Sequence, residues 1–263
     1  MTLSRNGQRI AWGALAGVCL VLATADPAHG QSRTAVNARI AAPVDLSGYW
    51  VSVITEDWRF RMITPAKGDY AGVPLNEEGR KFADAWSPAR DEAAAEPCKA
   101  FGAPAILRMP TRLHIYWADE STLRVDTDAG EQSRVFPFVG QAAAGTPQWQ
   151  GNSIAQWELA VSELPMGQGG PALREEKPRG GSLKVVTTHM RAGYLRKNGV
   201  PYSENATLTE YFSRTWEPNG DSWLLVTSIV EDPRYLTQPF LTSAQFKKQE
   251  GSTGWNPRPC GAK

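Results

Sequence analysis

Polar and apolar residues alternate with a period of two through much of residues 182–231, which is the pattern of β-strands that bury one face. Segments 205–214 and 222–231 are rich in Thr, Tyr, Phe, Trp, Val and Ile, and they are separated by a Pro-Asn-Gly-Asp sequence typical of a tight turn. We therefore predict a β-hairpin there. Segment 182–190 predicts a further strand, and residues 191–204 predict a long loop that contains an Asn-Gly turn.

Shorter segments earlier in the chain continue the strand pattern. In residues 112–117, Leu113 and Ile115 face one way while His114 and Tyr116 face the other. Further strands are predicted at 45–55, 105–109, 122–128, 132–138 and 153–161. The total of eight to ten strands, without alternating helices, predicts an antiparallel all-β fold. An up-and-down barrel closes its own edges and is the favoured architecture, with a two-sheet sandwich as the alternative.

Helical signals are confined to residues 76–96. Asn76 is a suitable N-cap, Glu77 and Glu78 follow it, and Phe82 and Trp86 are spaced four residues apart on one face. These features predict one short helix that ends before Pro88. A second short helix is predicted between Ala89 and Glu96.

The first 30 residues have the pattern of a secretory signal peptide. Arg5 and Arg9 precede an apolar run over residues 10–23, and small residues follow near residue 28. Residues 31–44 are small and polar without a period, so we expect a flexible leader. Residues 45–263 are then a single β-barrel domain, and we expect it to be periplasmic or secreted.

Charge argues against nucleic acid as a partner, and apolar content argues against a transmembrane helix in the mature chain. Residues 1–30 contain two of the 28 basic and one of the 27 acidic residues, so 26 of each remain after their removal. A chain with equal numbers of basic and acidic residues lacks the excess positive charge that attracts nucleic acid. No segment of the mature chain has the ~20 apolar residues of a transmembrane helix.

Two of the three cysteines, Cys98 and Cys260, remain after removal of the signal peptide. An even number of cysteines in an oxidising compartment favours pairing, so we predict a disulfide between them.

The opening strand begins with Gly48-Tyr49-Trp50, which resembles the Gly-x-Trp motif of lipocalins and the wider calycin group. In that group the Trp closes one end of an up-and-down barrel, so the resemblance implies the same fold here. Residues 45–260 also resemble a group of exported bacterial proteins of unassigned function. The shared segments are Glu-Asp-Trp-Arg at 56–59, Pro-Cys-Lys-Ala-Phe-Gly-Ala at 97–103 and Arg-Lys-Asn-Gly-Val-Pro-Tyr-Ser-Glu-Asn at 196–205. This second resemblance implies export and a barrel-like fold, without an activity.

Candidate acid/base residues are few. His114 and His189 are the two histidines of the mature chain, and both lie in predicted strands. An acid/base site in the barrel would combine them with Asp126, Glu210 or Tyr211. Alternation predicts that His189 faces inward with Leu183 and Val185, and that His114 faces outward. The sequence lacks metal-ligand spacings, a nucleophile elbow and a phosphate loop, so we predict no metal and no cofactor.

Candidate ligand-binding residues cluster in the 191–204 loop. Aromatic and basic side chains alternate there and can hold a carboxylate near the barrel mouth; with one residue of the 112–117 strand, the candidates are Tyr116, Arg191, Tyr194, Arg196 and Tyr202. The leading expectation is an exported barrel that binds a small, partly apolar molecule in its cavity, with the 191–204 loop near the mouth. The alternatives are a cofactor-free lyase, hydratase or isomerase on the same scaffold, and an envelope protein with a structural role.

Overall fold

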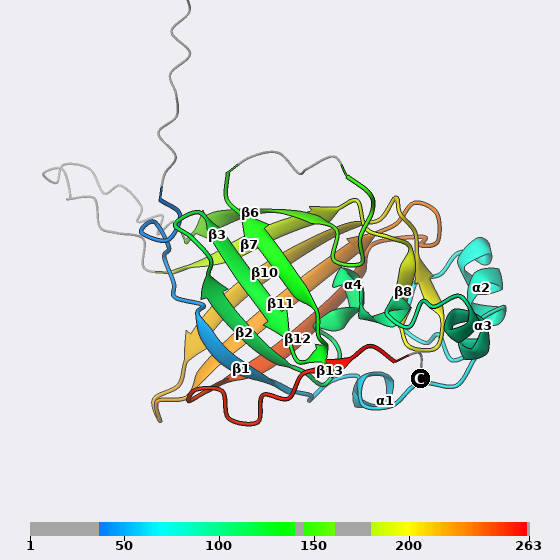
Figure 1. The fold of residues 1–263 in the computed structure, drawn as a ribbon, viewed down its shortest axis with the longest axis horizontal. Coiled ribbons are helices and arrows are strands. Elements are labelled where there is room, and N and C mark those ends of the chain that lie inside the picture. The colour runs from blue at the N-terminus through cyan, green and yellow to red at the C-terminus, as the bar shows by residue number, and fades with distance from the viewer. Residues whose placement is uncertain (1–36, 140–144, 161–179, 262–263) are drawn as a thin grey trace, which may run out of the picture. The chain divides into compact units, whose positions relative to one another are not determined.

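Nine strands form one antiparallel sheet that curves until its two edge strands, β5 and β6, lie next to each other, as the computed structural model shows (Figure 1). The structure describes residues 37–139, 145–160 and 180–261. The predicted barrel is confirmed, in preference to a two-sheet sandwich. The signal peptide predicted at residues 1–30 lies outside the described residues.

Neighbouring strands of the sheet are consecutive members of the nine along the chain, except that β1 also pairs with β12, the last of them. Around the sheet the order is β5-β3-β2-β1-β12-β11-β10-β7-β6, so the first strand lies between β2 and β12. The strands are β1 (Gly48–Val53), β2 (Arg112–Trp117), β3 (Thr122–Thr127), β5 (Ser133–Pro137), β6 (Asn152–Leu159), β7 (Gly181–Thr188), β10 (Thr207–Trp216), β11 (Ser222–Glu231) and β12 (Phe240–Gln249).

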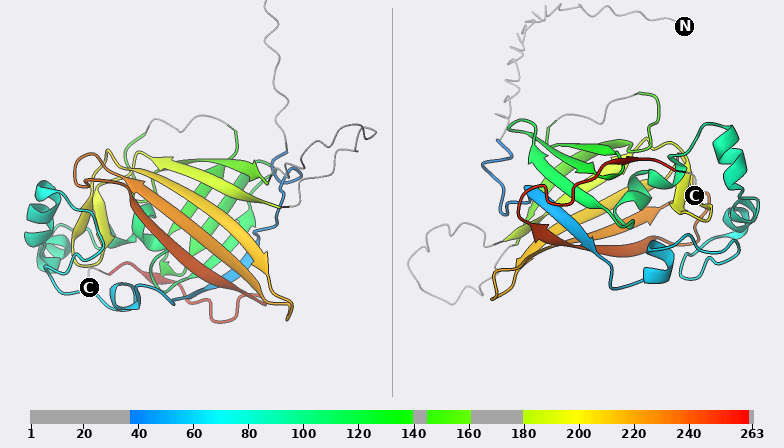
Figure 2. Two further views of the ribbon diagram at one scale, coloured as in Figure 1. Left: turned by 180° about the vertical axis from the view of Figure 1, so that it is seen from behind. Right: turned by 60° about the horizontal axis from the view of Figure 1, so that its bottom comes forward.

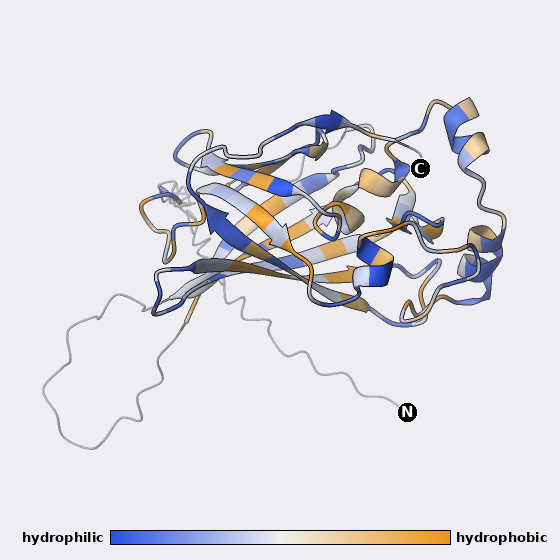
Figure 3. Ribbon diagram, turned by 90° about the horizontal axis from the view of Figure 1, so that it is seen from below, coloured by the Kyte–Doolittle hydropathy of each residue, from blue (hydrophilic) through white to orange (hydrophobic). Residues whose placement is uncertain are grey.

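Side chains that alternate along the strands fill the barrel interior. Alternate positions of β2 (Leu113 and Ile115) and of β7 (Leu183, Val185 and Thr187) are buried and the intervening ones are partly exposed, and Figure 3 shows hydropathy alternating along the strands. Trp50 is fully buried and its indole N–H donates to the carbonyl of Leu46 at 2.9 Å. The ammonium of Lys248 lies 4.5 Å from the centre of the Trp50 ring and forms a cation–π contact.

The barrel interior also contains a buried ion pair. The guanidinium of Arg134 in β5 donates to both carboxylate oxygens of Glu210 in β10, at 2.9 and 2.6 Å. The Nη2 of Arg134 also lies 3.3 Å from the Thr187 hydroxyl, which in turn lies 2.8 Å from that of Ser153. The ion pair between Arg134 and Glu210 therefore links β5 to β10 across the interior.

Short helices and a small hairpin gather at one end of the barrel, and we call this part the cap (Figures 1 and 2). Its elements are α1 (Trp58–Arg61), α2 (Glu77–Asp84), α3 (Pro88–Ala93), the 3-10 helix η1 (Lys99–Phe101), α4 (Ala103–Ile106), β8 (Gly193–Arg196) and β9 (Val200–Tyr202). Asn76 caps α2 as predicted, since its side chain accepts a hydrogen bond from the amide of Gly79 at 2.8 Å.

Three sequence predictions differ from the structure, two of them in the cap and one at the start of the described chain. Residues 105–109, predicted as a strand, lie in and after helix α4, whose four residues are all buried. The 191–204 loop forms the paired strands β8 and β9. Part of the predicted flexible leader packs on the barrel, because Ala38 and Val44 are buried and the carbonyl of Ala38 accepts from the Trp157 indole at 2.9 Å.

The predicted disulfide is confirmed. Cys98, just before η1, is bonded to Cys260, and their Cα atoms are 5.1 Å apart. The same C-terminal segment forms β13 (Arg258–Pro259), which pairs in parallel with β4 (Ala129–Gly130). The bond therefore fastens the cap to a segment that lies along the barrel. Among the described residues, no helix has the length and apolar content needed to cross a membrane.

Candidate functional site

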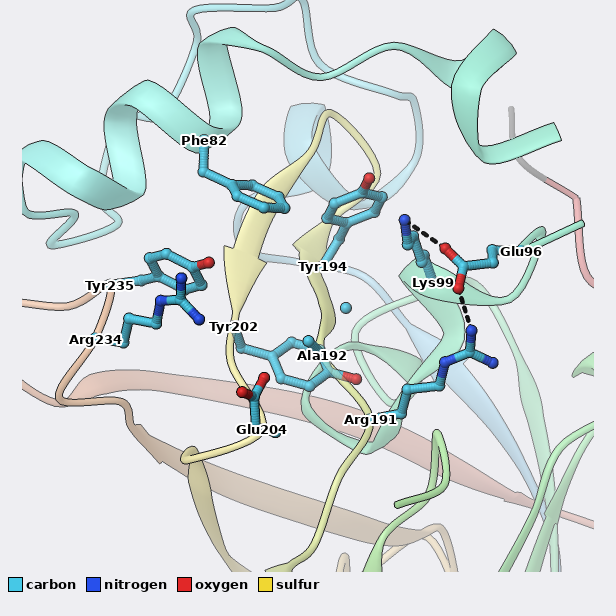
Figure 4. Close-up of a pocket in the computed structure, with 11 residues that line it drawn as sticks. Phe82, Glu96, Lys99, Arg191, Ala192, Tyr194, Tyr202, Glu204, Arg234 and Tyr235 are labelled. Carbon is cyan, nitrogen blue, oxygen red and sulfur yellow. Dashed lines mark hydrogen bonds and ion pairs between the residues drawn. The ribbon is translucent and has the colours of Figure 1, made fainter. Parts of the chain in front are cut away.

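A pocket of about 370 Å³ lies in the cap, outside the barrel interior (Figure 4). Four separate segments form its walls: α2, the segment from Glu96 to Lys99, the β8–β9 hairpin with its flanking residues, and the loop after β11. A shallower hollow of about 420 Å³ over Val73, Pro74 and Phe240 has no charged side chain in its lining. The first pocket is the candidate site because it combines aromatic walls with charged groups at its edge.

Four aromatic side chains line the pocket: Phe82, Tyr194, Tyr202 and Tyr235. Figure 4 shows Phe82 next to Tyr235, and their ring centres are 5.4 Å apart. Tyr235 is buried, whereas 43% of the surface of Phe82 is exposed. An exposed phenylalanine on a short helix adds apolar surface to the pocket that the protein itself does not cover.

Two of the tyrosines are held in different ways. The Tyr194 hydroxyl donates to the carboxylate of Asp91, with oxygen separations of 2.9 and 3.0 Å. Burial, and then this bond, raises the pKa of Tyr194. The Tyr202 hydroxyl is buried and has no hydrogen-bond partner in the described part of the chain, and burial raises the pKa of Tyr202 too. Both phenols are therefore neutral at physiological pH.

The position of Tyr202 explains two glycines of the cap. A Cβ atom on Gly102 would lie 2.0 Å from the Tyr202 hydroxyl oxygen, and one on Gly193 would lie 2.7 Å from it. Neither position has room for a side chain. The two glycines allow the Tyr202 ring to pack between η1 and β8 and to form one wall of the pocket.

Charged groups along one side of the pocket are paired with one another. Glu96 accepts from Lys99 at 2.6 Å and from Arg191 (Figure 4). The bond from Lys99, followed by the charges of Lys99 and Arg191, lowers the pKa of Glu96 despite its partial burial. Lys99 also lies 2.9 Å from Asp91. Glu96 thus fixes the positions of two cations at the pocket edge.

The opposite side of the pocket carries one cation and one acid. Arg234 pairs with Glu78 of α2 at 2.9 Å, and Glu204 is exposed beyond the end of β9. The pocket lining therefore includes three cationic side chains, Lys99, Arg191 and Arg234, and two acidic ones, Glu96 and Glu204. Asp91 and Glu78, which pair with Lys99 and Arg234 from outside the lining, add two more acids, so the charges around the pocket are close to balanced.

The structure brings together three of the five residues predicted to bind a ligand. Arg191, Tyr194 and Tyr202 all line the pocket. Arg196, on the same hairpin, lines a separate cleft. Tyr116 lies on the outer face of β2, where its hydroxyl donates to Asp126 at 3.1 Å.

His114 lies on the outer face of the barrel, as the alternation of β2 predicts. Its ring stacks between those of Tyr49 and Tyr116, with centres 4.2 and 4.7 Å away. Asp126 is its register partner on β3. Burial lowers the pKa of His114, while the charge of Asp126 acts in the opposite direction.

His189 differs from its prediction. It has a φ of 52° immediately after β7, and its side chain is exposed. This left-handed residue ends the strand, so the alternation of Leu183, Val185 and Thr187 does not extend to it, and Met190 is buried instead. The inward orientation expected from periodicity is therefore wrong.

The remaining candidates for acid/base chemistry are dispersed. Glu210 is inside the barrel and paired with Arg134, whereas Tyr211 faces outward with the Lys184 ammonium 5.6 Å from its ring centre. Glu210 and Tyr211 are adjacent in the chain but point to opposite faces of the sheet. Among the described residues, His114 and Asp126 are therefore the only two of the five predicted catalytic residues that lie side by side on one face. Among the described residues, no group of three or more His, Cys, Asp or Glu is placed to hold a metal ion.

Sequence reasoning missed most of the other pocket residues. The helical pattern singled out Phe82 as part of an apolar face, and Lys99 lies within the shared segment at 97–103, but no motif marks Glu96, Arg234 or Tyr235. These residues come from segments far apart in the chain, and only tertiary packing brings them together. The exposed face of α2 and the shared segment at 97–103 were the available signals for these residues.

The fold and the pocket together define an antiparallel β-barrel with one capped end and a small aromatic-lined pocket in that cap. No protein family, curated protein or solved structure matches the chain.

Proposed function

We propose that the chain is an exported binding protein that holds a small, partly apolar molecule in the cap pocket. The observation that carries this proposal is the cluster of four aromatic side chains around about 370 Å³ of open space. Binding sites for small molecules typically have volumes of roughly 300–1,000 Å³, apolar walls and a few placed polar groups. A pocket near the lower limit suits a molecule of one or two rings.

The oriented cations at one edge of the pocket support a ligand with an acidic group. Lys99 and Arg191 are held by Glu96 at one edge, and Arg191 retains 47% of its side-chain exposure. A guanidinium that is already oriented can bind a carboxylate without losing much further conformational freedom. The ligand would then stack its ring against the tyrosines and place its acidic group near Arg191.

Two features support export. The chain contains a disulfide, Cys98–Cys260, and disulfides form and persist mainly in oxidising compartments. The basic start and apolar run of the first 30 residues have the pattern of a secretory signal. Together they favour a periplasmic or secreted location, where a pocket of this type would meet small molecules from outside the cell.

A variant that fills the pocket tests the proposal. Ala192 lines the pocket and is exposed, so Ala192→Trp should occupy the space without removing a native contact. The probes are single-ring aromatic acids and the matching neutral alcohols, with affinities measured by titration calorimetry. We expect at least one acid to bind the wild-type protein, and Ala192→Trp to weaken that binding by about tenfold or more.

Ala118→Trp is the matched control. Ala118 is an exposed residue in the turn after β2, away from the cap. The Ala118→Trp variant should bind the same probe as tightly as the wild-type protein. Equal affinity in all three proteins would place the binding site elsewhere, and failure of every acid to bind would contradict the proposed ligand class.

A further inference from the structure

A second polar cluster lies at the end of β8, around residues 195–197, and shares no lining residue with the pocket. Three arginines from separate segments meet there: Arg61 at the end of α1, Arg108 after α4, and Arg196 at the end of β8. Their exposed fractions are 4%, 7% and 5%. Arginines are rarely buried to this extent without compensating charges.

The carboxylates of the cluster balance only part of this charge. Arg61 pairs with Glu56 at 2.6 Å, and Arg108 pairs with Asp57 at 2.8 Å. Arg196 forms no ion pair with a carboxylate of the described residues; its Nη1 donates to the carbonyl of Ala71 at 2.8 Å. Its guanidinium also stacks 4.1 Å from the centre of the Phe60 ring.

Two buried nitrogen atoms of the cluster have no hydrogen-bond partner among the residues that the structure describes. They are Nη2 of Arg61 and Nε of Arg196, and both are buried. Unpaired buried donors of a charged group are costly, so native structures usually satisfy them with protein groups, water or a bound ion. The side chain of Arg61 is 1% exposed.

The arginines line a narrow cleft, together with Lys197. Its enclosed volume is about 20 Å³, which is enough for about one water molecule. Four cationic side chains therefore surround a space of atomic size. Burial, followed by the charge of Arg108, lowers the pKa of Arg196 to about 10, and burial alone lowers the pKa of Lys197.

We propose that this cleft binds a small oxyanion, one oxygen atom of which enters between Arg61 and Arg196. The guanidinium group matches carboxylate, phosphate and sulfate oxygens in geometry and charge. The rest of the anion would remain at the mouth of the cleft near Lys197. Its negative charge would compensate the cations that Glu56 and Asp57 leave unbalanced.

The test compares anions at one ionic strength. Sodium phosphate, sulfate, acetate and chloride are added to the wild-type protein, and the melting temperature and calorimetric affinity are measured. We expect at least one oxyanion to bind and to raise the melting temperature more than chloride does. An equal effect of chloride would mean general screening or a spherical-ion site, and it would overturn the proposal.

Arg196→Met and Lys197→Met locate the effect. Arg196→Met removes the guanidinium that lacks a carboxylate partner, and Lys197→Met removes a half-buried cation at the same cleft. Each should weaken binding of the effective oxyanion by about tenfold or more while the fold is retained, as checked by near-ultraviolet circular dichroism. The second variant serves if the first fails to fold.

Arg59→Met is the matched control. Arg59 lies in the same helix as Arg61, but its side chain is 54% exposed, pairs with Asp69 and does not line the cleft. The Arg59→Met variant loses one positive charge, as Arg196→Met does, and should keep wild-type affinity for the anion. A loss as large as that of Arg196→Met would show a general charge effect and would contradict a built site.

Discussion

The barrel interior and the cap each contain buried arginine, but they compensate its charge differently. Inside the barrel, Arg134 faces a single carboxylate that accepts two hydrogen bonds, so the charges of Arg134 and Glu210 cancel. In the cap, Arg61 and Arg108 have acidic partners with 34% and 45% side-chain exposure, and Arg196 has none. One buried nitrogen of Arg134, Nε, also lacks a partner among the described residues, so unmade hydrogen bonds occur in both regions and charge balance is what distinguishes them.

The difference indicates which polar groups belong to the fold and which are available to a ligand. The ion pair of the barrel is complete within the protein and links two strands across the interior. The cap contains residual positive charge, an orphan tyrosine hydroxyl and open space. We therefore expect stability to depend mainly on the barrel, and the proposed binding to depend mainly on the cap.

The largest expected effect comes from breaking the ion pair of the barrel. Glu210→Gln preserves the shape of the side chain but leaves the Arg134 charge buried without its partner. We expect the free energy of unfolding in urea to fall by about 3–5 kcal/mol. Glu158→Gln is the control, because Glu158 pairs with Lys184 at the surface at 3.5 Å and should change stability by less than about 1 kcal/mol. Similar small losses in both variants would show that the buried pair is not a structural element.

The disulfide tests how strongly the cap depends on its attachment to the barrel. Replacing Cys98 and Cys260 together by Ser should lower the free energy of unfolding by about 2–4 kcal/mol, since the bond closes a long loop. Reduction of the wild-type protein should produce a loss of similar size. A loss below about 1 kcal/mol in both experiments would mean that noncovalent packing alone holds the cap in place.

A smaller effect should be confined to the cap. The Asn76 side chain caps α2 through Gly79 and also donates to the Arg234 carbonyl at 2.7 Å. Asn76→Ala should cost about 1 kcal/mol, seen as faster amide hydrogen exchange in α2 while the strands of the barrel remain protected.

Lys81→Ala provides the comparison on the same helix, because Lys81 is exposed and forms a surface pair with Glu77 at 2.8 Å. It should leave exchange in α2 nearly unchanged. Faster exchange throughout the barrel in Asn76→Ala would indicate that the two regions open together, and it would contradict the separation drawn above.

The strands were predictable because their physical cause is local. In β2 and β11 one face is buried and the other is not, so the period of two is visible in the sequence. Helix α4 escaped detection because all of Ala103–Ile106 is buried. An apolar run without a polar face has no period, and a short helix and a strand then look alike.

Single backbone angles and tertiary packing account for the other failures. His189 turns outward through one left-handed residue, which composition and alternation do not reveal. Arg134 occupies an inward position of β5 next to Phe136, and its burial depends on Glu210 from a distant strand. Three of the pocket residues were predicted from the crowding of aromatic and basic residues in one loop, whereas the rest depend on how α2 and η1 pack against that loop.

The position of β1 between β2 and β12 has a consequence for the order of assembly. Tyr49 pairs with Gln249 and Val53 with Gln245, so the first strand finds one of its two neighbours only when β12 is present. Pairings between residues so distant in the chain favour slow folding, because much conformational entropy is lost before these contacts form. Until then β1 and β11 each present an unpaired edge, which is a surface prone to aggregation. A chain interrupted before Phe240 should therefore collect in aggregates rather than form a smaller barrel.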